Sequence, residues 1–243
     1  MIKDAWWLVR NELRSQPFAV LFTLLSTAFF AMMTAYFFKH GIIEPKEDFG
    51  AHYLLDAVFL LIVPNFVTIY LAGYYLDFRA MREDPLRKLM LFYRSCPIPL
   101  QTISFSRSLK MLFLFMLQSI LFFAIFIALL NQFGMPATIF RDLSLFILFW
   151  LGCGLALGSS VPFIEYGISL RMVYYVCFIW VCLFFIVHVT LKIIFKMGIV
   201  GLVWQGLQQF GLPLTIVSLL IGVLSCYFWN RRLYARLQTN DYL

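Results

Sequence analysis

Residues 111–130 read MLFLFMLQSILFFAIFIALL, twenty positions without a charged side chain. A helix needs about 20 predominantly apolar residues to cross the hydrocarbon of a membrane, and this segment meets that length. It lacks the alternation of polar and apolar residues, over about ten residues, that is typical of a transmembrane barrel strand. The segment therefore predicts a membrane-spanning helix.

Five further apolar stretches of similar length lie on either side of it. We predict six transmembrane helices, over residues 17–38, 54–76, 111–130, 143–164, 172–194 and 212–229. The 243-residue chain is 63% hydrophobic and 13% charged, against about 45–50% and about 25% in an average globular domain. This composition excludes a soluble enzyme, a disordered tail and a nucleic-acid-binding domain. The predicted fold class is an all-α integral membrane protein, with one transmembrane domain over residues 1–243.

The basic residues predict the orientation of these spans. Fourteen Lys and Arg residues lie in the N-terminal segment, the 77–110 loop, the 165–171 loop and the C-terminal tail, whereas five lie toward the opposite side of the membrane. Because cytoplasmic loops of membrane proteins carry the excess of Lys and Arg, both termini are expected in the cytoplasm. The net charge of +7 then reflects topology and attraction to anionic membrane lipids. We expect no nucleic-acid partner.

Residues 1–16 predict a short helix that lies in the membrane interface. At 100° per residue, apolar side chains fall on one side and polar side chains on the other, as in helices that rest at the headgroup level. The apolar side carries Ile2, Ala5, Trp6, Val9 and Leu13. Two interpretations stay open: a simple anchor, or an elbow helix that also contacts a cytoplasmic partner.

The loop over residues 77–110 is too long for a minimal connection and predicts a helix of its own. Asp84 can cap a helix that begins at Pro85, a favoured first position. The Cys96–Pro99 stretch ends that helix because proline lacks the N–H donor, and a new helix begins near Leu100 and continues into the third span. The predicted apolar side consists of Leu86, Leu89, Met90 and Tyr93. This is either a docking helix below the membrane or a solvated, positively charged loop.

Residues 196–213, KMGIVGLVWQGLQQFGLP, are too polar and glycine-rich for a clean span and too apolar for a free loop. We expect one or two short re-entrant helices here, between the fifth and sixth spans, with protein covering their backbone. In the fourth span, Gly152, Gly154 and Gly158 form a face of small residues. Such faces allow helices to approach closely, which predicts helix packing.

No catalytic, metal or cofactor site is predicted on this chain. It has no phosphate-binding Gly-x-x-x-x-Gly-Lys-Ser/Thr motif, its three histidines are scattered, and its five cysteines have no paired spacing. Asp56 is the one carboxylate in the predicted spans, and His188 and Lys192 lie in the outer part of the fifth span. Ionisable groups at membrane depth are costly and often functional. They either reach the interface by snorkelling or meet one another at an outer gate.

Two motifs carry a family resemblance. Asn11-Glu12-Leu13-Arg14 ends the N-terminal helix, and the run from Tyr93 to Leu100, YRSCPIPL, is followed by Ser106-Arg107-Ser108-Leu109. The second run is similar to the "Leu-x-x-Pro-Ile-Ser … Arg/Lys-x-Leu" run that follows the coupling helix in ABC-2-type transporter permeases, with Pro99 where the family often has serine. The chain resembles these permeases over its whole length.

This resemblance implies a function and a set of partners. Two such subunits, identical or related, would pair in the cytoplasmic membrane of a bacterium and sit on two ABC ATP-binding subunits, which hold ATP and magnesium. The coupling helix, about Arg82 to Arg94, would dock on the ATPase. Its implied contacts are Arg82, Glu83, Arg87, Lys88 and Arg94. The cargo would be amphipathic: a peptide, an antibiotic or a lipid-like molecule. The alternative is a stand-alone polytopic membrane protein, such as an enzyme, a scaffold or an ATP-independent carrier.

Overall fold

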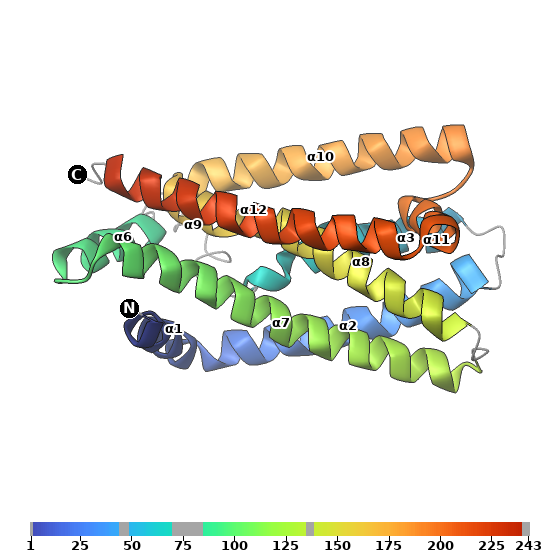
Figure 1. Cartoon of the computed structure of the whole chain (residues 1–243), viewed down its shortest axis with the longest axis horizontal. Helices are drawn as coiled ribbons and strands as arrows, with labels where there is room; N and C mark the ends of the chain where they lie inside the picture. The colour runs from blue at the N-terminus through green and yellow to red at the C-terminus, as the bar shows by residue number, and fades with distance from the viewer. Residues whose placement is uncertain (1, 44–48, 70–84, 135–138, 240–243) are drawn as a thin grey trace.

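A computed structural model describes residues 2–43, 49–69, 85–134 and 139–239, and every regular element within these ranges is a helix. The long helices run roughly side by side along the longest axis of the molecule (Figure 1). The all-helical class predicted from the sequence is therefore confirmed.

Five helical segments are long and apolar enough to cross a membrane. They are α2 (Pro17–Phe38) with the π-helical η1 (Lys39–Ile43), α7 (Leu100–Gln132), α8 (Phe140–Gly158) with α9 (Val161–Gly167), α10 (Leu170–Phe195) and α12 (Leu212–Thr239). These segments contain the predicted spans over 17–38, 111–130, 143–164, 172–194 and 212–229. Many of their large apolar side chains are exposed, as expected of surfaces that face lipid.

The predicted span over residues 54–76 is confirmed as helical only in its first half. Its first half forms α3 (Phe49–Ala57), the π-helical η2 (Val58–Ile62) and the 3-10 helix η3 (Val63–Val67), and residues 70–76 lie outside the described part of the chain. Pro64 lies at the start of η3. Because proline has no N–H group and its ring clashes with the preceding turn, an α-helix cannot pass through it undisturbed.

A glutamine of the neighbouring α7 satisfies the backbone where this helix breaks. Gln118 is 1% exposed, and its Nε2 donates to the carbonyl oxygens of Phe66 at 2.7 Å and Thr68 at 3.0 Å. Its Oε1 accepts a hydrogen bond from Thr27 of α2 at 3.1 Å. Irregular backbone at membrane depth is tolerated only where protein satisfies it. Gln118 therefore holds α2, α7 and the broken helix together.

The small face of α8 packs as predicted. A Cβ added to Gly158 would lie 2.5 Å from the carbonyl oxygen of Pro64, and one added to Gly152 would lie 2.4 Å from Oγ of Ser218 in α12. On the facing helix, a Cβ at Gly222 would lie 2.8 Å from the carbonyl oxygen of Gly152. No side chain fits in these contacts. The glycines therefore let α8 approach both η3 and α12 at backbone distance.

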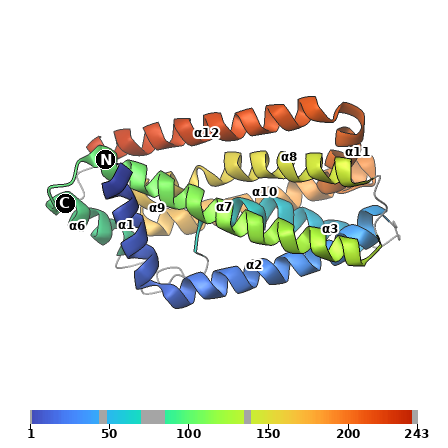
Figure 2. The same ribbon diagram turned by 60° about the horizontal axis from the view of Figure 1, so that its bottom comes forward.

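The helix α1 (Ile2–Ser15) crosses the long helices at one end of the bundle, where α12 also ends (Figure 2). We call this the terminal end. The helix α6 (Pro85–Ser95) lies at the same end. α7 begins there too: its 33 residues correspond to about 50 Å, longer than the roughly 30 Å hydrocarbon core of a bilayer. Its first eleven residues precede the predicted span, so they are available to pack against α1 and α6.

Candidate functional site

Four helices meet around one buried cation at the terminal end. Arg107 of α7 donates to the Glu12 carboxylate of α1 and, at 3.1 Å, to the hydroxyl of Tyr166 in α9. Its guanidinium carbon lies 5.0 Å from the ring centre of Tyr93 in α6 and 4.7 Å from that of Tyr166. Lys110, one turn along α7, donates to the other oxygen of Glu12 at 2.6 Å. We call these five residues the polar junction.

The polar junction is removed from solvent. The side chain of Arg107 is 2% exposed, and those of Glu12 and Lys110 are each 9% exposed. Burial disfavours the ionised form of Glu12, but the charges of Arg107 and Lys110 outweigh it and hold the pKa of this carboxyl below its ordinary value. Glu12 is therefore a carboxylate at neutral pH, and both buried cations donate to it.

The local sequence explains how Glu12 reaches Arg107. Ala5, Leu8 and Val9 are buried and, with Glu12, repeat at the spacing i, i+3, i+4 and i+7 that places residues on one face of a helix. The predicted apolar face of α1 is correct for Ala5 and Val9. The prediction did not place Glu12 on this face, however, because it assigned only apolar residues to it. A carboxylate on the buried stripe of an interfacial helix was the signal for this ion pair.

The apolar side of α6 packs against a second hydrophobic core. Leu86 and Met90 are 2% and 1% exposed, and Leu89 and Tyr93 are half-buried. The core that they enter contains buried residues of α7, α9, α10 and α12: Ile103, Tyr166, Val173, Leu233 and Leu237. The predicted start of α6 at Pro85, its apolar side and its end before Cys96 are confirmed.

The residues predicted to contact a partner are placed unevenly. Arg82 and Glu83 lie outside the described residues. The backbone places Arg87 and Arg94 on α6, and the side chain of Lys88 is exposed. Phe92, which was not among the predicted contacts, is 62% exposed on the same helix. An exposed phenylalanine beside charged positions is a second indication, besides charge, that this side of α6 is a contact surface.

A second buried carboxylate lies at the opposite end of the bundle. Asp56 of α3 is 0% exposed. Its Oδ2 lies 2.7 Å from Nδ1 of His188 in α10, so the contact considered from the sequence is present. The two carboxylate oxygens also accept the N–H groups of Ile199 and Val200, each at 2.8 Å. Lys192 lies one turn beyond His188 and is half-buried.

Asp56 thereby caps the start of α11 (Ile199–Phe210), a helix that lies between α10 and α12 in the sequence. The first N–H groups of a helix have no partner within it and carry partial positive charge, so a carboxylate is favourable there. Lys196 ends α10 with a φ of 57°, which turns the chain back toward Asp56. A Cβ at Gly198 would lie 2.8 Å from Oδ2 of Asp56, so the approach requires glycine at this position.

The region predicted to be re-entrant is therefore a helix tied to α3 by one carboxylate. Trp204 packs its ring against Phe38 at 5.3 Å and Phe146 at 5.6 Å, between ring centres. These rings belong to the main hydrophobic core, which α2, α3, α7 and α8 share. α11 is thus held by its N-terminal cap and by Val200, Trp204 and Leu207, which are buried in this core.

Within the described ranges, no group of three or more His, Cys, Asp or Glu residues is placed to hold a metal ion. Comparison with known proteins finds no family model, no curated protein and no solved structure that matches this chain.

Proposed function

We propose that this chain is the membrane-spanning subunit of an ATP-driven exporter of the ABC-2 type. α6 is its coupling helix, seated below the cytoplasmic leaflet with both termini on the same side. The observation that supports this most is the attachment of α6. One side of the helix is buried in the second hydrophobic core, and the ring of Tyr93 on that side contacts Arg107. The other side presents Lys88 and Phe92 outward.

This arrangement suits a docking element because the two sides have separate tasks. A short helix that is fixed on one side can transmit a displacement only if the other side meets a partner. Charged and aromatic side chains on the outward side give such a contact orientation and energy. The partner would be an ABC ATP-binding subunit that holds ATP and magnesium, and a second permease subunit, identical or related, would complete the path.

The opposite end would form the outer gate of this path. In this proposal Asp56, His188 and Lys192 control the position of α11, which acts as the re-entrant segment. The second span, over residues 54–76, brings the number of membrane-spanning segments to six. The cargo is an amphipathic molecule such as a peptide, an antibiotic or a lipid-like compound. Cargo class follows from the family resemblance alone, because fold and function are separable.

The proposal is tested by purifying the chain from its native cells in gentle detergent and identifying the co-purifying proteins by mass spectrometry. Phe92→Asp combined with Lys88→Glu changes the outward side of α6 without touching its buried side. Phe210→Asp makes the same aromatic change at the opposite end, where Phe210 is 65% exposed. We expect an ABC ATPase with the wild type and with Phe210→Asp, and its loss from the α6 variant.

Absence of any ABC ATPase, under conditions that keep other transporters of the same cells intact, would overturn the proposal. A stand-alone membrane function would then take its place. Retention of the ATPase by the α6 variant would instead refute the assignment of the docking surface and leave the exporter class supported.

A further inference from the structure

The exposed face of α12 runs from the membrane-spanning segment into a pair of arginines at the terminal end. Leu220, Leu224 and Tyr227 are 56%, 65% and 68% exposed, as expected of side chains that face lipid. Arg231 lies seven residues after Leu224, which is about two helical turns and therefore the same face. Both Arg231 and Arg232 are exposed. The lipid-facing stripe of α12 thus ends in positive charge.

The two arginines lie at the depth of the lipid headgroups. The predicted span ends at residue 229, and Arg231 follows two residues later, about 3 Å along the helix axis. Tyr227 and Phe228 precede the pair, and aromatic side chains are enriched at the boundary between hydrocarbon and water. The guanidinium carbon of Arg232 lies 5.1 Å from the ring centre of Phe228. This contact holds the Arg232 side chain beside the membrane boundary.

No carboxylate within the described part of the chain neutralises this pair. α12 has three arginines and no acidic residue over its 28 residues, and none of the ion pairs between described residues includes Arg231 or Arg232. The third arginine, Arg236, donates from Nε to the carbonyl oxygen of Gly167 at 3.3 Å. This contact brings Arg236 to the link that precedes α10, where Arg171 is exposed. The positive charge therefore continues from the end of α12 to the start of α10.

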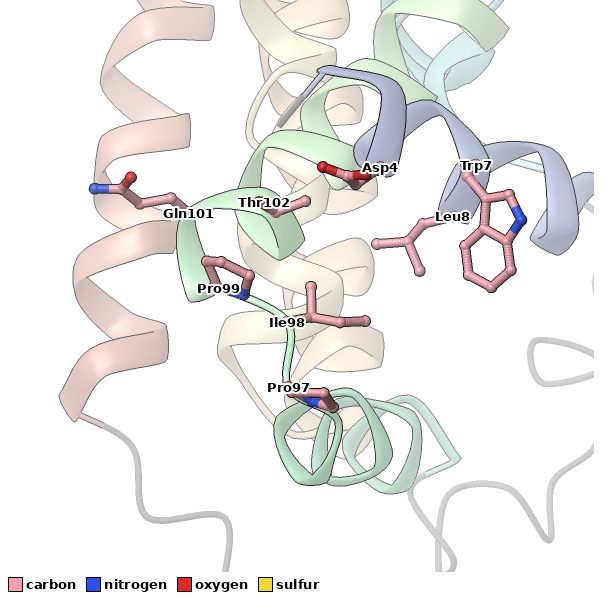
Figure 3. A pocket seen from close by; sticks show the side chains of 8 residues that line it. All are labelled: Asp4, Trp7, Leu8, Pro97, Ile98, Pro99, Gln101 and Thr102. Atoms are coloured by element: carbon pink, nitrogen blue, oxygen red, sulfur yellow. The ribbon is translucent and has the colours of Figure 1, made fainter.

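A hollow on the other side of α7 does not suit an anion. A notch of about 550 Å³ lies between α1 and the first turn of α7, and Figure 3 shows α12 on the far side of α7 from it. The described residues that line the notch include the carboxylate of Asp4 and no basic residue. On the side of α7 toward α12, the hydroxyl of Ser104 donates to Oδ1 of Asn230 at 2.9 Å. An anionic headgroup is therefore expected at the arginines of α12 and not in the notch.

We propose that the terminal end of α12 binds an anionic phospholipid of the surrounding leaflet. The lipid phosphate lies between the guanidinium groups of Arg231 and Arg232, whose planar sets of N–H donors match phosphate oxygens. An acyl chain follows the exposed face of α12 along Leu224 and Leu220. Net negative charge selects the lipid, because the ammonium or trimethylammonium group of a zwitterionic lipid is repelled by the arginines. The site does not depend on the exporter proposal, because it requires no ATPase and no cargo.

The test uses the purified full chain in detergent and native mass spectrometry. The protein is titrated with dioleoyl phosphatidylglycerol and, separately, with dioleoyl phosphatidylcholine, which has the same acyl chains and no net charge. Arg231→Gln combined with Arg232→Gln removes both charges, and Arg231→Lys combined with Arg232→Lys keeps them. Arg141→Gln combined with Lys196→Gln is the matched control, because it removes two exposed charges at the opposite end. All of these positions are exposed, so the variants should fold, which their unfolding midpoints check.

We expect the glutamine pair to lower the affinity for phosphatidylglycerol roughly 25-fold, about fivefold for each basic side chain at the membrane surface. The lysine pair should retain most of the affinity, because it keeps the charge without the planar set of donors, and the control pair should retain all of it. Wild-type affinity in the glutamine pair would overturn the proposal, as would equal binding of the two lipids by the wild type. An equal loss in the control pair would also overturn it, because the lipid would then respond to the net charge of the chain and not to this surface.

Discussion

Replacing Glu12 with glutamine is the sharpest perturbation of the terminal end. The substitution keeps the size of the side chain and removes one charge. Arg107 and Lys110 then remain buried, at 2% and 9% side-chain exposure, without their shared counter-ion. Breaking a buried ion pair by removing one partner costs about 3–5 kcal/mol.

This cost can be measured as a shift in thermal stability. For a chain of this size, 1 kcal/mol corresponds to about 2–4 °C in the unfolding midpoint. We therefore expect Glu12→Gln to unfold about 6–20 °C below the wild type in the same detergent. Unfolding is measured by size-exclusion chromatography of samples heated to a series of temperatures. Asp142→Asn, in the first turn of α8 at the opposite end, serves as the control.

A double-mutant cycle then separates the ion pair from the change of shape. If Glu12 and Lys110 interact as described, Glu12→Gln and Lys110→Met should together cost less than the sum of the single changes, with a coupling of about 0.5–3 kcal/mol. A loss below about 1 kcal/mol for Glu12→Gln, or additive single changes, would refute the reasoning. Either result would mean that solvent reaches the polar junction.

Four further outcomes are expected. Acidification should destabilise the wild type more than Glu12→Gln. The pKa of Glu12 in the folded state lies below its ordinary value of 4.5, so the stabilisation by its charge is complete above about pH 4.5 and is lost as the pH falls through the folded-state pKa. Thermal unfolding midpoints measured at several pH values check this. Gln118→Leu should cost about 2–6 kcal/mol, since two buried carbonyls lose their donor; a midpoint within 2 °C of the wild type would contradict this. Gly158→Ala should lower the yield of folded protein, whereas Gly206→Ala, with 3.6 Å to its nearest neighbour, should not. Asp56→Asn should cost about 2–4 kcal/mol and increase hydrogen exchange at the start of α11; unchanged exchange there would exclude the capping role.

Those parts of the fold could be predicted from the sequence in which a single physical rule decides the structure. Helix length in a bilayer is set by hydrocarbon thickness, so the apolar runs gave the five long segments, and Pro85 and Pro97 gave the start and end of α6. The broken helix at Pro64 was not predicted as such. Its hydropathy is that of a span, and the deciding residue, Gln118, is distant in sequence and buried in α7.

The two ends differ in how far the sequence could identify their residues. Asp56 was selected because a carboxylate within an apolar run is rare and costly, and His188 was a stated partner. Glu12 lies in a helix that is half polar, where a carboxylate is common and does not by itself indicate burial. Its partner Arg107 looked like one of many basic residues that set topology. Only the packing of α1 across α7 shows that both are buried.

The contact energies at the terminal end determine which parts move together. Tyr93 contacts Arg107 by its ring, an interaction worth about 0.5–2 kcal/mol, whereas breaking the Glu12 ion pair costs about 3–5 kcal/mol. If these two contacts were the only ones, α6 would detach from α7 more easily than α1 would. Leu86 and Met90 change the balance, because burying each contributes about 1.5–3 kcal/mol. Leu8 and Val9 of α1 are buried as well, so both helices are attached by several kcal/mol. We therefore expect a force on α6 to displace α1 and α7 with it instead of separating the three helices.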